Sequence, residues 1–312
     1  MLRFDRLRRA LSSFNYGTYS WAAIPLCDPN HPIIQTSSSR PADAIGKQSL
    51  TLTSWNIQAS QSGPVPRSKL ILDHILKAPK SSDIIHLQEV TSSVRRSLLD
   101  DPRVRSDFLT TDAEDDTSFE RLPFATMTLL STKRFRSPFL DEEGKGGQKL
   151  MLDNVFRMEL PSRYRRDALC VDIAAPAASG AVFRLLNVHL DSLDSHFRRA
   201  LQMLALAGLL REPGCRGGVI AGDFNTISPE DHRLVDKHEL LDAWVALHGS
   251  TGSDGATWGV GVELEGGLKA GRLDKVVMLG LKPDEIEVLQ PRLNESDRPW
   301  SDHCGLRCTF TM

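Results

Sequence analysis

The stretch Gly218-Val-Ile-Ala-Gly-Asp-Phe-Asn225 places an acid and a carboxamide directly after a short apolar run. Residues i and i+2 of an extended chain point the same way, so Asp223 and Asn225 share one side. Four further strings carry similar residues, in the order Ser54-Trp55-Asn56, Leu87-Gln88-Glu89-Val90, Asn187-Val188-His189-Leu190-Asp191 and Ser301-Asp302-His303. All but the last close a strand-like run, and the last precedes one, so a sheet can deliver these side chains to one cleft. Oxygen ligands with histidine and no cysteine suit Mg²⁺ and phosphate ester chemistry.

Length and composition are those of an ordinary globular protein. The chain has 312 residues, 40% hydrophobic and 25% charged, which allows one large α/β domain or two small ones. The formal net charge of −2 gives no argument for nucleic-acid binding, although a local basic groove would be enough. Scattered cysteines without a secretory leader favour a reducing compartment, and no apolar run approaches the ~18 residues of a membrane-spanning helix. We expect an intracellular protein of the nucleus or cytoplasm, with the mitochondrion as an alternative.

Residues 1–47 differ in composition from the rest of the chain. Arginines and apolar residues alternate near the start, and a segment with many Asn, Ser, Pro and Thr residues follows. An arginine-rich start with few acids is typical of a mitochondrial transit peptide. The alternative is a partly ordered extension that packs on the domain edge through Trp21, Ile24 and Leu26. We therefore divide the chain into an N-terminal extension, 1–47, and a catalytic domain, 48–312.

From residue 48 onward, strand-like and helix-like patterns alternate. Strands are predicted over 50–57, 83–88, 124–130, 168–173, 182–188, 218–222, 273–278 and 305–311. Helices are predicted over 67–77, 91–99 and 195–210, and Gly-rich loops over 135–152 and 249–271. A hairpin next to helical crossovers favours mixed over parallel sheets. The pattern predicts an α/β fold in which two packed mixed β-sheets are flanked by helices.

The acids and amides in these strings also have ordinary structural interpretations. Glu89 ends a strand too apolar to be exposed, so its carboxylate needs a partner, which a salt bridge or a helix terminus would also supply. Asp223 and Asn225 follow a strand, where they are also common turn residues. These alternatives stay open for each string taken alone.

Alternative interpretations also remain for the two histidines. His189 is placed to touch a phosphate oxygen, or to fill a buried position with a backbone partner. His303 would be oriented by an acid that raises its pKa, and Asp274 is the candidate. The alternative for Asp274 is a salt bridge with Lys275 or Arg272.

Together the ordered strings resemble the endonuclease/exonuclease/phosphatase superfamily, the divalent-metal phosphoesterases that include DNase I-like nucleases. The matching strings are SWNI (54–57), LQEV (87–90), NVHLDS (187–192), GDFN (222–225), RLDKV (272–276) and SDHCGL (301–306). The resemblance covers about residues 48–312. It implies a four-layer α/β sandwich, in agreement with the two mixed sheets predicted above.

The resemblance also implies a metal site and substrate contacts. Glu89 would be the principal Mg²⁺ ligand, with Asn56 beside it and Asp302 as a further carboxylate, and Mn²⁺ is an alternative ion. Three residues near these strings would contact the substrate: Asp191, Ser192 and Trp258.

The implied reaction is a one-step, in-line attack of water on phosphorus, without a covalent enzyme intermediate. Asp223 would orient or activate the water, Asn225 and His189 would hold the phosphate, and Asp274 would pair with His303. Electrostatic stabilisation of the charge on the non-bridging oxygens would come from the metal and His303.

Within the superfamily the chain most resembles the tyrosyl-DNA phosphodiesterase 2 family, through FATMTLLS (124–131), LCVDI (169–173), ATWG (256–259) and RLDKVVM (272–278). It departs from that family at three places, where Gln58 replaces an Asp, and Leu193-Asp194 and Ile227 replace arginines. The implied substrate is nucleic acid or another phosphodiester, and we expect a monomer. Two alternatives remain open: a lipid or inositol-phosphate hydrolase of the same superfamily, and a non-catalytic binding scaffold.

Overall fold

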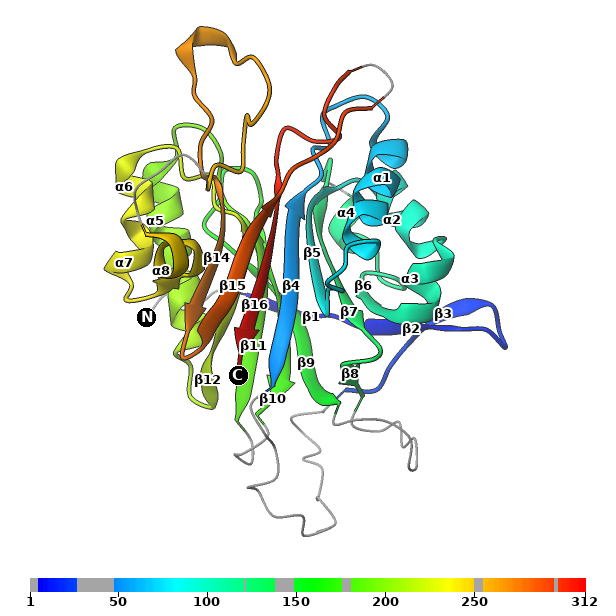
Figure 1. The fold of residues 1–312 in the computed structure, drawn as a ribbon. Coiled ribbons are helices and arrows are strands. Elements are labelled where there is room, and N and C mark those ends of the chain that lie inside the picture. The colour runs from blue at the N-terminus through cyan, green and yellow to red at the C-terminus, as the bar shows by residue number, and fades with distance from the viewer. Residues whose placement is uncertain are drawn as a thin grey trace.

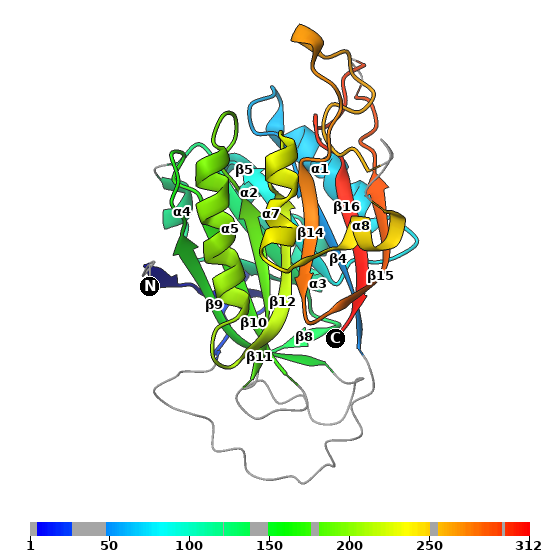
Figure 2. The ribbon, with the colours of Figure 1, turned by 90° about the vertical axis from the view of Figure 1, so that its left-hand side faces the viewer.

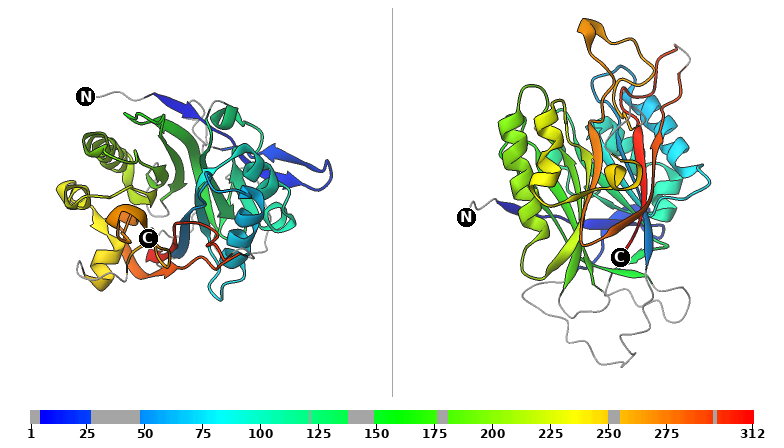
Figure 3. Two further views of the ribbon diagram at one scale, coloured as in Figure 1. Left: turned by 90° about the horizontal axis from the view of Figure 1, so that it is seen from above. Right: turned by 60° about the vertical axis from the view of Figure 1, so that its left-hand side comes forward.

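Two eight-stranded β-sheets pack face to face, and helices cover the outer face of each (Figures 1 and 3). The computed structural model describes residues 5–26, 48–120, 122–137, 149–175, 181–249, 255–294 and 297–312. The four layers run helices, sheet, sheet, helices, so the predicted α/β sandwich of DNase I-like type is confirmed. None of the helices in these described ranges is long and apolar enough to cross a bilayer.

The first sheet has the order β1-β9-β10-β11-β12-β14-β13, with β8 paired to β9. Its strands are β1 (Arg6–Arg8), β8 (Phe135–Arg136), β9 (Leu150–Glu159), β10 (Asp167–Ala174), β11 (Val182–His189), β12 (Cys215–Asp223), β13 (Leu241–Asp242) and β14 (Asp274–Leu279). Along the main order, only β11 and β12 run parallel, because helix α5 (His196–Leu210) connects them on the outer face.

The second sheet has the order β15-β16-β4-β5-β7-β6-β2-β3. Its strands are β2 (Leu11–Asn15), β3 (Ser20–Ala23), β4 (Ser49–Asn56), β5 (Ile84–Val90), β6 (Phe108–Thr111), β7 (Ala125–Ser131), β15 (Lys282–Leu289) and β16 (Gly305–Thr311). In this sheet β4 and β5 form the parallel pair, and helix α1 (Pro64–Leu76) makes the crossover between them.

The helices divide between the two outer faces. The first sheet is covered by α5 (His196–Leu210), α6 (Pro229–His232) and α7 (Leu234–Lys237), as Figure 2 shows for α5 and α7. Helix α8 (Ala243–His248) instead contacts β14 of the first sheet and β15 of the second. The second is covered by α1 (Pro64–Leu76), α2 (Ser92–Leu99), α3 (Pro102–Asp107) and α4 (Thr117–Glu120). Thr91 accepts a hydrogen bond from Val94 N and caps α2 at its N-terminus.

Three apolar clusters hold these layers together. Leu52, Leu185 and Phe310 belong to the central cluster, which lies between the sheets. Leu206 and Ile220 belong to the cluster under α5, and Ile71, Ile85 and other residues form the one under α1 and α2. Alternate side chains of each strand thus face the central cluster or an outer one, which holds both sheets in fixed register.

Strand direction brings the polar strings to one edge of the sandwich. The parallel strands β4 and β5 end there, and so do β11 and β12. Because β14 is antiparallel to β12 and β16 is antiparallel to β4, both begin at this edge. Residues just before or at the start of β14 and β16 therefore meet residues at the ends of the other four strands.

The N-terminal residues contribute strands to both sheets. β1 pairs with β9 at the edge of the first sheet, and β2 pairs with β6 in the second. Ile24 is buried in the central cluster, and Trp21 Nε1 donates to the carbonyl oxygen of Leu99 at 3.1 Å. The described part of the extension, 5–26, thus packs as part of the sandwich; the division at residue 47 and a targeting role stay predictions.

Sequence patterns missed several strands. The predicted loop over 135–152 is wrong at both ends, because β8 and the start of β9 fall inside it, while 138–148 lie outside the described residues. β15 was also missed, since its sequence KPDEIEVL contains a proline and three acids. An edge strand tolerates these residues, because one side of it needs no ladder hydrogen bonds.

Gly222 is required where β11 and β12 approach each other. Its φ is +149°, and a Cβ added there would lie 1.9 Å from the carbonyl oxygen of Val188. We expect Gly222→Ala to lower the free energy of unfolding by about 2 kcal/mol or more, because the paired backbone must move. Urea unfolding followed by circular dichroism measures this change.

Gly208→Ala on α5 is the matched control, since a Cβ there meets nothing within 4 Å. This exposed helical site should gain about 0.5–1 kcal/mol. Equal unfolding midpoints for the two variants would contradict the close approach at Gly222.

Candidate active site

Two strand ends of the second sheet supply the first part of the site. Asn56 is the last residue of β4 and is buried. Glu89 lies in β5 at a bulge, where the register with β7 shifts between Leu87 and Val90 and its φ is +57°. Such bulges re-aim side chains next to active sites. Here Glu89 turns into the cavity described below, where Ala59 N donates to its Oε2 at 2.7 Å.

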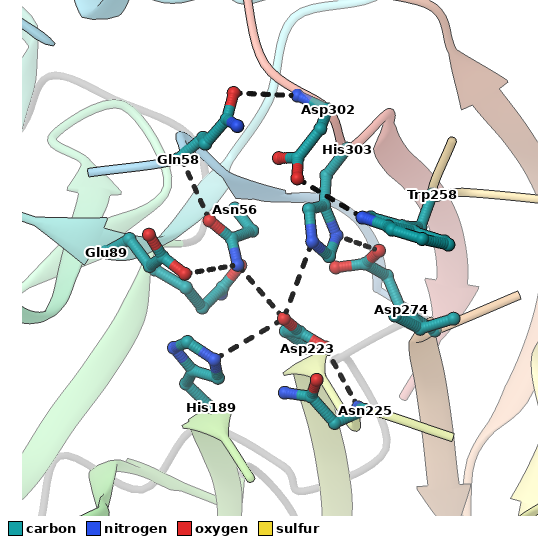
Figure 4. Close-up of polar contacts among 12 residues, drawn as sticks. Asn56, Gln58, Glu89, His189, Asp223, Asn225, Trp258, Asp274, Asp302 and His303 are labelled. Atoms are coloured by element: carbon teal, nitrogen blue, oxygen red, sulfur yellow. Dashed lines mark hydrogen bonds and ion pairs between the residues drawn. The ribbon is translucent and has the colours of Figure 1, made fainter. Parts of the chain in front are cut away.

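Asn56 joins this sheet to the first one. Its Nδ2 donates to Glu89 Oε1 at 3.3 Å and to Asp223 Oδ2 at 2.9 Å, while its Oδ1 accepts from Gln58 N at 2.9 Å (Figure 4). Asp223 is the last residue of β12, so one carboxamide holds two carboxylates from different sheets. Burial, with the nearby charge of Asp223, raises the pKa of Glu89.

Asp223 is the centre of the contacts in Figure 4. Besides Asn56, it accepts at Oδ1 from Asn225 N at 2.8 Å, and His303 Nε2 lies 3.8 Å from its Oδ2. Burial raises the pKa of Asp223 to about 6, with the Asp274 carboxylate adding to the shift and His303 opposing it. Asp223 is therefore ionised near neutral pH, yet basic enough to accept a proton.

His303 and Asp274 form a buried pair. His303 Nδ1 lies 2.8 Å from Asp274 Oδ2, and Asp274 N donates to Thr257 Oγ1 at 2.9 Å. Burial alone would lower the pKa of His303, but the carboxylates of Asp274 and Asp223 raise it to about 10. The imidazole is therefore cationic at neutral pH, with Nε2 directed at Asp223.

The pKa of His189, the last residue of β11, is shifted in the opposite direction to that of His303. Burial, together with Arg166 and His303, holds the pKa of His189 well below 6.5, so the ring is neutral. Arg166 Nη2 lies 3.2 Å from His189 Nε2, and a guanidinium only donates, so Nε2 accepts this hydrogen bond. The 3.4 Å approach of Nε2 to Asp223 Oδ2 is then not an ion pair.

Arg166 is a site residue that the sequence prediction missed. Burial lowers its pKa, while Asp223 and Glu89 oppose the shift, which places the cation among the acids of the site. Its guanidinium lies 5.0 Å from the centre of the Phe124 ring and 5.6 Å from that of Tyr164. The available signal was the run Arg163-Tyr-Arg-Arg166 directly before a strand, which combines cations with an aromatic residue.

Asp302 and Trp258 lie on the other side of His303. Trp258 Nε1 donates to Asp302 Oδ2 at 3.2 Å, and Asp302 N donates to Gln58 Oε1 at 3.0 Å. The second oxygen, Asp302 Oδ1, is buried and has no hydrogen-bond partner among the described residues. Gln58 therefore accepts a backbone hydrogen bond at the place where the resembling family carries an acid.

Asn225, Ser192 and Asp191 differ in their access to the site. Asn225 and Ser192 line the cavity, and Asn225 Nδ2 also donates to the carbonyl oxygen of Leu190 at 3.1 Å. Asp191 is fully buried, and its carboxylate accepts from Arg163 N at 2.8 Å and Gln202 Nε2 at 2.8 Å, and from Ser162. Because β11 ends at His189, the two-residue alternation does not continue to Asp191. We therefore leave Asp191 out of the substrate contacts proposed below.

These residues meet at a cavity of about 880 Å³. Its wall includes Glu89, His189, Asp223, Asn225 and His303. Cations and aromatic rings also line it, among them Arg165, Arg166, Phe124, Tyr164 and Trp258. A concave site with convergent polar groups and shifted pKa values is the expected form of an active site.

Two groups of side chains could hold a metal ion. Asp223, Asp274 and His303 offer ligand atoms within 4.8 Å of one another, but Asp274 already occupies His303 Nδ1. Glu89 and Asp302 fit better, because Glu89 is a half-buried carboxylate of raised pKa that lines the cavity and Asp302 Oδ1 lacks a partner among the described residues. Both are hard oxygen donors of the kind that Mg²⁺ prefers.

Asp274→Asn removes the carboxylate that faces His303 Nδ1. The pKa of His303 should fall from about 10 to its ordinary 6.5 or below, because burial then acts with less opposition. In the native protein the stability from this raised pKa is fully present below about pH 6.5 and is lost as pH rises through about 10. NMR titration of the imidazole ring measures the shift.

Asp284→Asn, on exposed β15, is the matched control and should leave the titration unchanged. If His303 titrates at the same pH in the Asp274→Asn protein as in the native one, the two residues are not coupled in the way described.

Both the sequence and the fold are similar to those of known proteins. The sequence matches the Endonuclease/Exonuclease/phosphatase family over residues 53–303, and no curated protein matches it. D. rerio tyrosyl-DNA phosphodiesterase 2 (TDP2), complexed with single strand DNA product, has a TM-score of 0.64 and 18% identity over 85% of this chain and 99% of that one. Truncated Caenorhabditis elegans TDP2 has a TM-score of 0.64 and 21% identity over 85% and 98%.

The catalytic domain of human Nocturnin, with a bound sulfate anion, is also similar, with a TM-score of 0.57 and 20% identity over 88% of this chain and 99% of that one. At these identities the structural likeness shows the fold, while the family match covers most of the sequence. The chain belongs to the endonuclease/exonuclease/phosphatase family and is a hydrolase that acts on phosphoester bonds.

Proposed function

We propose that the protein is a Mg²⁺-dependent phosphodiesterase that hydrolyses a phosphoester of nucleic acid by direct attack of water, as a TDP2-like enzyme. The observation that carries this proposal is the contact of Asn56 with both Glu89 and Asp223, two carboxylates that line the cavity. A buried and a half-buried carboxylate held by one carboxamide favour a cation beside them, and His303 and Arg166 lie near Asp223 to complete a site for phosphate.

Glu89 and Asp302 are the proposed metal ligands, with Asn56 fixing the orientation of Glu89. A bound Mg²⁺ would polarise a phosphate oxygen and offset negative charge in the transition state. Mn²⁺ satisfies the same oxygen donors and is an alternative ion. The raised pKa of Glu89 fits this role, since its ionised form gains most from a nearby cation.

Asp223 would orient the attacking water and accept its proton. Its pKa of about 6 makes the carboxylate the ionised form at neutral pH, close to the ideal for a general base. The backbone of Asn225 and the side chain of Asn56 hold the carboxylate in place, so its reactive face is fixed before substrate binds. No covalent intermediate is required, because no nucleophilic side chain is needed for attack by water.

Three side chains would donate hydrogen bonds to the phosphate, and His189 would orient one of them. His303 is cationic and directs Nε2 at Asp223, while Arg166 brings a second cation and donates to His189 Nε2. Asn225 has a second amide hydrogen beyond the one given to Leu190. These preformed donors stabilise charge on the non-bridging oxygens without reorganisation.

Nucleic acid is the proposed substrate class because cations and aromatic rings line the cavity together, with Arg166 over the rings of Phe124 and Tyr164. Arg165 and Arg166 line the cavity with Tyr164 and Phe124, and Trp258 lies by His303. Such a combination binds a phosphate backbone and stacks on bases or other rings. TDP2 of similar fold has been seen with single strand DNA product. We propose an intracellular location, in the nucleus or cytoplasm, to match this substrate.

Glu89→Gln should reduce Mg²⁺-dependent hydrolysis of bis-p-nitrophenyl phosphate by about a thousandfold or more, on the scale of lost electrostatic stabilisation at other active sites. The same variant should lose the rise in melting temperature that Mg²⁺ gives the native protein, because the ligand is gone. Steady-state kinetics with Mg²⁺ or EDTA and thermal unfolding in both conditions give the two readouts.

Glu114→Gln, at an exposed position, is the matched control and should retain both activity and stabilisation by the metal. Undiminished turnover by Glu89→Gln would remove Glu89 from the metal site. Comparing 5′-phosphotyrosyl DNA, abasic DNA, poly(A), sphingomyelin and inositol phosphates as substrates of the native protein then tests the nucleic-acid assignment.

A further inference from the structure

Three large aliphatic side chains line the cavity while remaining exposed. Leu193 is 69% exposed, Ile227 is 54% exposed and Leu268 is 61% exposed. Single exposed hydrophobic residues are ordinary on a protein surface, but three that meet at one catalytic cavity are not scattered. They give part of the cavity wall an apolar character.

The order of the first sheet separates this apolar part from the cations. Arg165 and Arg166 directly precede β10, at one side of the row of strands that meets the cavity. Leu193 follows β11, Ile227 follows β12, and Leu268 precedes β14, in the order in which these strands lie beyond β10. The residues that line the cavity therefore change from cationic beside β10 to apolar beside β11, β12 and β14, and His189 and Asp223 end the first two of these three strands.

Leu193 is held rigidly in its exposed position. Its φ is +60°, a left-handed conformation that a leucine rarely adopts without support. The support comes from its carbonyl oxygen, which accepts from Ser195 N and from Arg199 Nη1, each at 2.8 Å. Arg199 is buried, and its Nη2 pairs with Asp231 at 2.8 Å.

Asp231 also holds the backbone next to Ile227. The residue after it, Ser228, donates from its N to Asp231 Oδ2 at 3.1 Å, and its hydroxyl caps α6 by accepting from Asp231 N at 3.2 Å. The residue before it, Thr226, donates from Oγ1 to the carbonyl oxygen of Arg272 at 2.6 Å. Asp231 therefore holds the loops of both Leu193 and Ile227, so the two side chains are presented by a preorganised frame.

We propose that Leu193, Ile227 and Leu268 form a subsite for an apolar group carried on one ester arm of the phosphodiester. The proposal rests on the phosphodiesterase activity proposed above, and it names these residues as specificity determinants of that reaction. The phosphate would lie between the two parts of the wall, with a charged or polar arm toward Arg165 and Arg166. The shared chemistry of the other arm is apolar surface, supplied by either an aryl ring or an alkyl chain.

Calorimetric binding of methyl, hexyl and phenyl phosphate in the presence of Mg²⁺ tests the subsite. Hexyl or phenyl phosphate should bind the native protein at least about tenfold more tightly than methyl phosphate, because an apolar arm leaves water. The double variant Leu193→Ser/Ile227→Ser should lose most of that advantage and bind methyl phosphate within about twofold of the native protein. Both side chains are exposed, so their truncation leaves the core intact.

Phe197→Ser is the matched control, since Phe197 is 75% exposed on α5 but does not line the cavity. It should bind all three esters as the native protein does. Preference for phenyl phosphate identifies an aryl arm, and preference for hexyl phosphate identifies an alkyl arm. Equal affinities for the three esters, or a preference that survives in the double variant, would overturn the subsite.

Turnover of methyl p-nitrophenyl phosphate is measured separately on the same proteins. Absence of Mg²⁺-dependent turnover by the native protein would contradict the proposed function, whatever the binding data show. Turnover without any preference among the bound esters would leave the function standing and remove the apolar subsite. The two failures are therefore distinguishable.

Discussion

The carboxamide of Asn56 is the contact on which the rest of the site depends. Glu89 and Asp223 come from different sheets, and both are negatively charged when ionised and largely buried, so they repel each other. The two hydrogen bonds from Asn56 Nδ2 offset part of that repulsion and set how the sheets meet at this edge. Without this bridge, the sheets would still pack through the central cluster, but the acids would lack a fixed mutual position.

Burial then gives neighbouring groups different protonation states. The pKa of Asp223 is raised to about 6 and that of His303 to about 10, while that of His189 is lowered well below 6.5. A carboxylate, a cationic imidazole and a neutral imidazole therefore coexist around one phosphate position. Titratable groups whose environments separate their pKa values are the usual basis for dividing acid, base and binding roles. The sandwich contributes by burying all three side chains.

The sequence was most informative where a side chain suited to metal or phosphate binding stands at the end of a strand. Asn56, Glu89, Asp223 and His189 end or nearly end strands, and strand direction alone brings them to one edge. The pairing of His303 with Asp274 was also predictable, because an adjacent Asp302 on an extended chain faces away. Local pattern of this kind, with the family resemblance, was enough for the fold class and for the positions of eight of the sixteen strands in the described residues.

The features that the sequence did not predict depend on contacts between distant segments of the chain. Arg166 became recognisable only when Phe124 and His189 were seen beside it. Asp191 was expected to contact the substrate, but its carboxylate is fully buried and accepts from Gln202 Nε2 at 2.8 Å. The N-terminal strands pair with β9 and β6, far along the chain, so no local pattern could reveal them.

The most direct test of a single catalytic centre is a double-mutant cycle in kcat/KM between Asn56→Ala and Asp223→Asn, measured with an activated phosphodiester. Residues that act as one unit give strongly non-additive losses. The double variant should therefore lose less activity than the product of the two single losses, because the contact between Asn56 and Asp223 is already broken in Asp223→Asn and only the contact with Glu89 remains to be lost. Losses that multiply would mean that the two strand ends act independently, and would contradict the account.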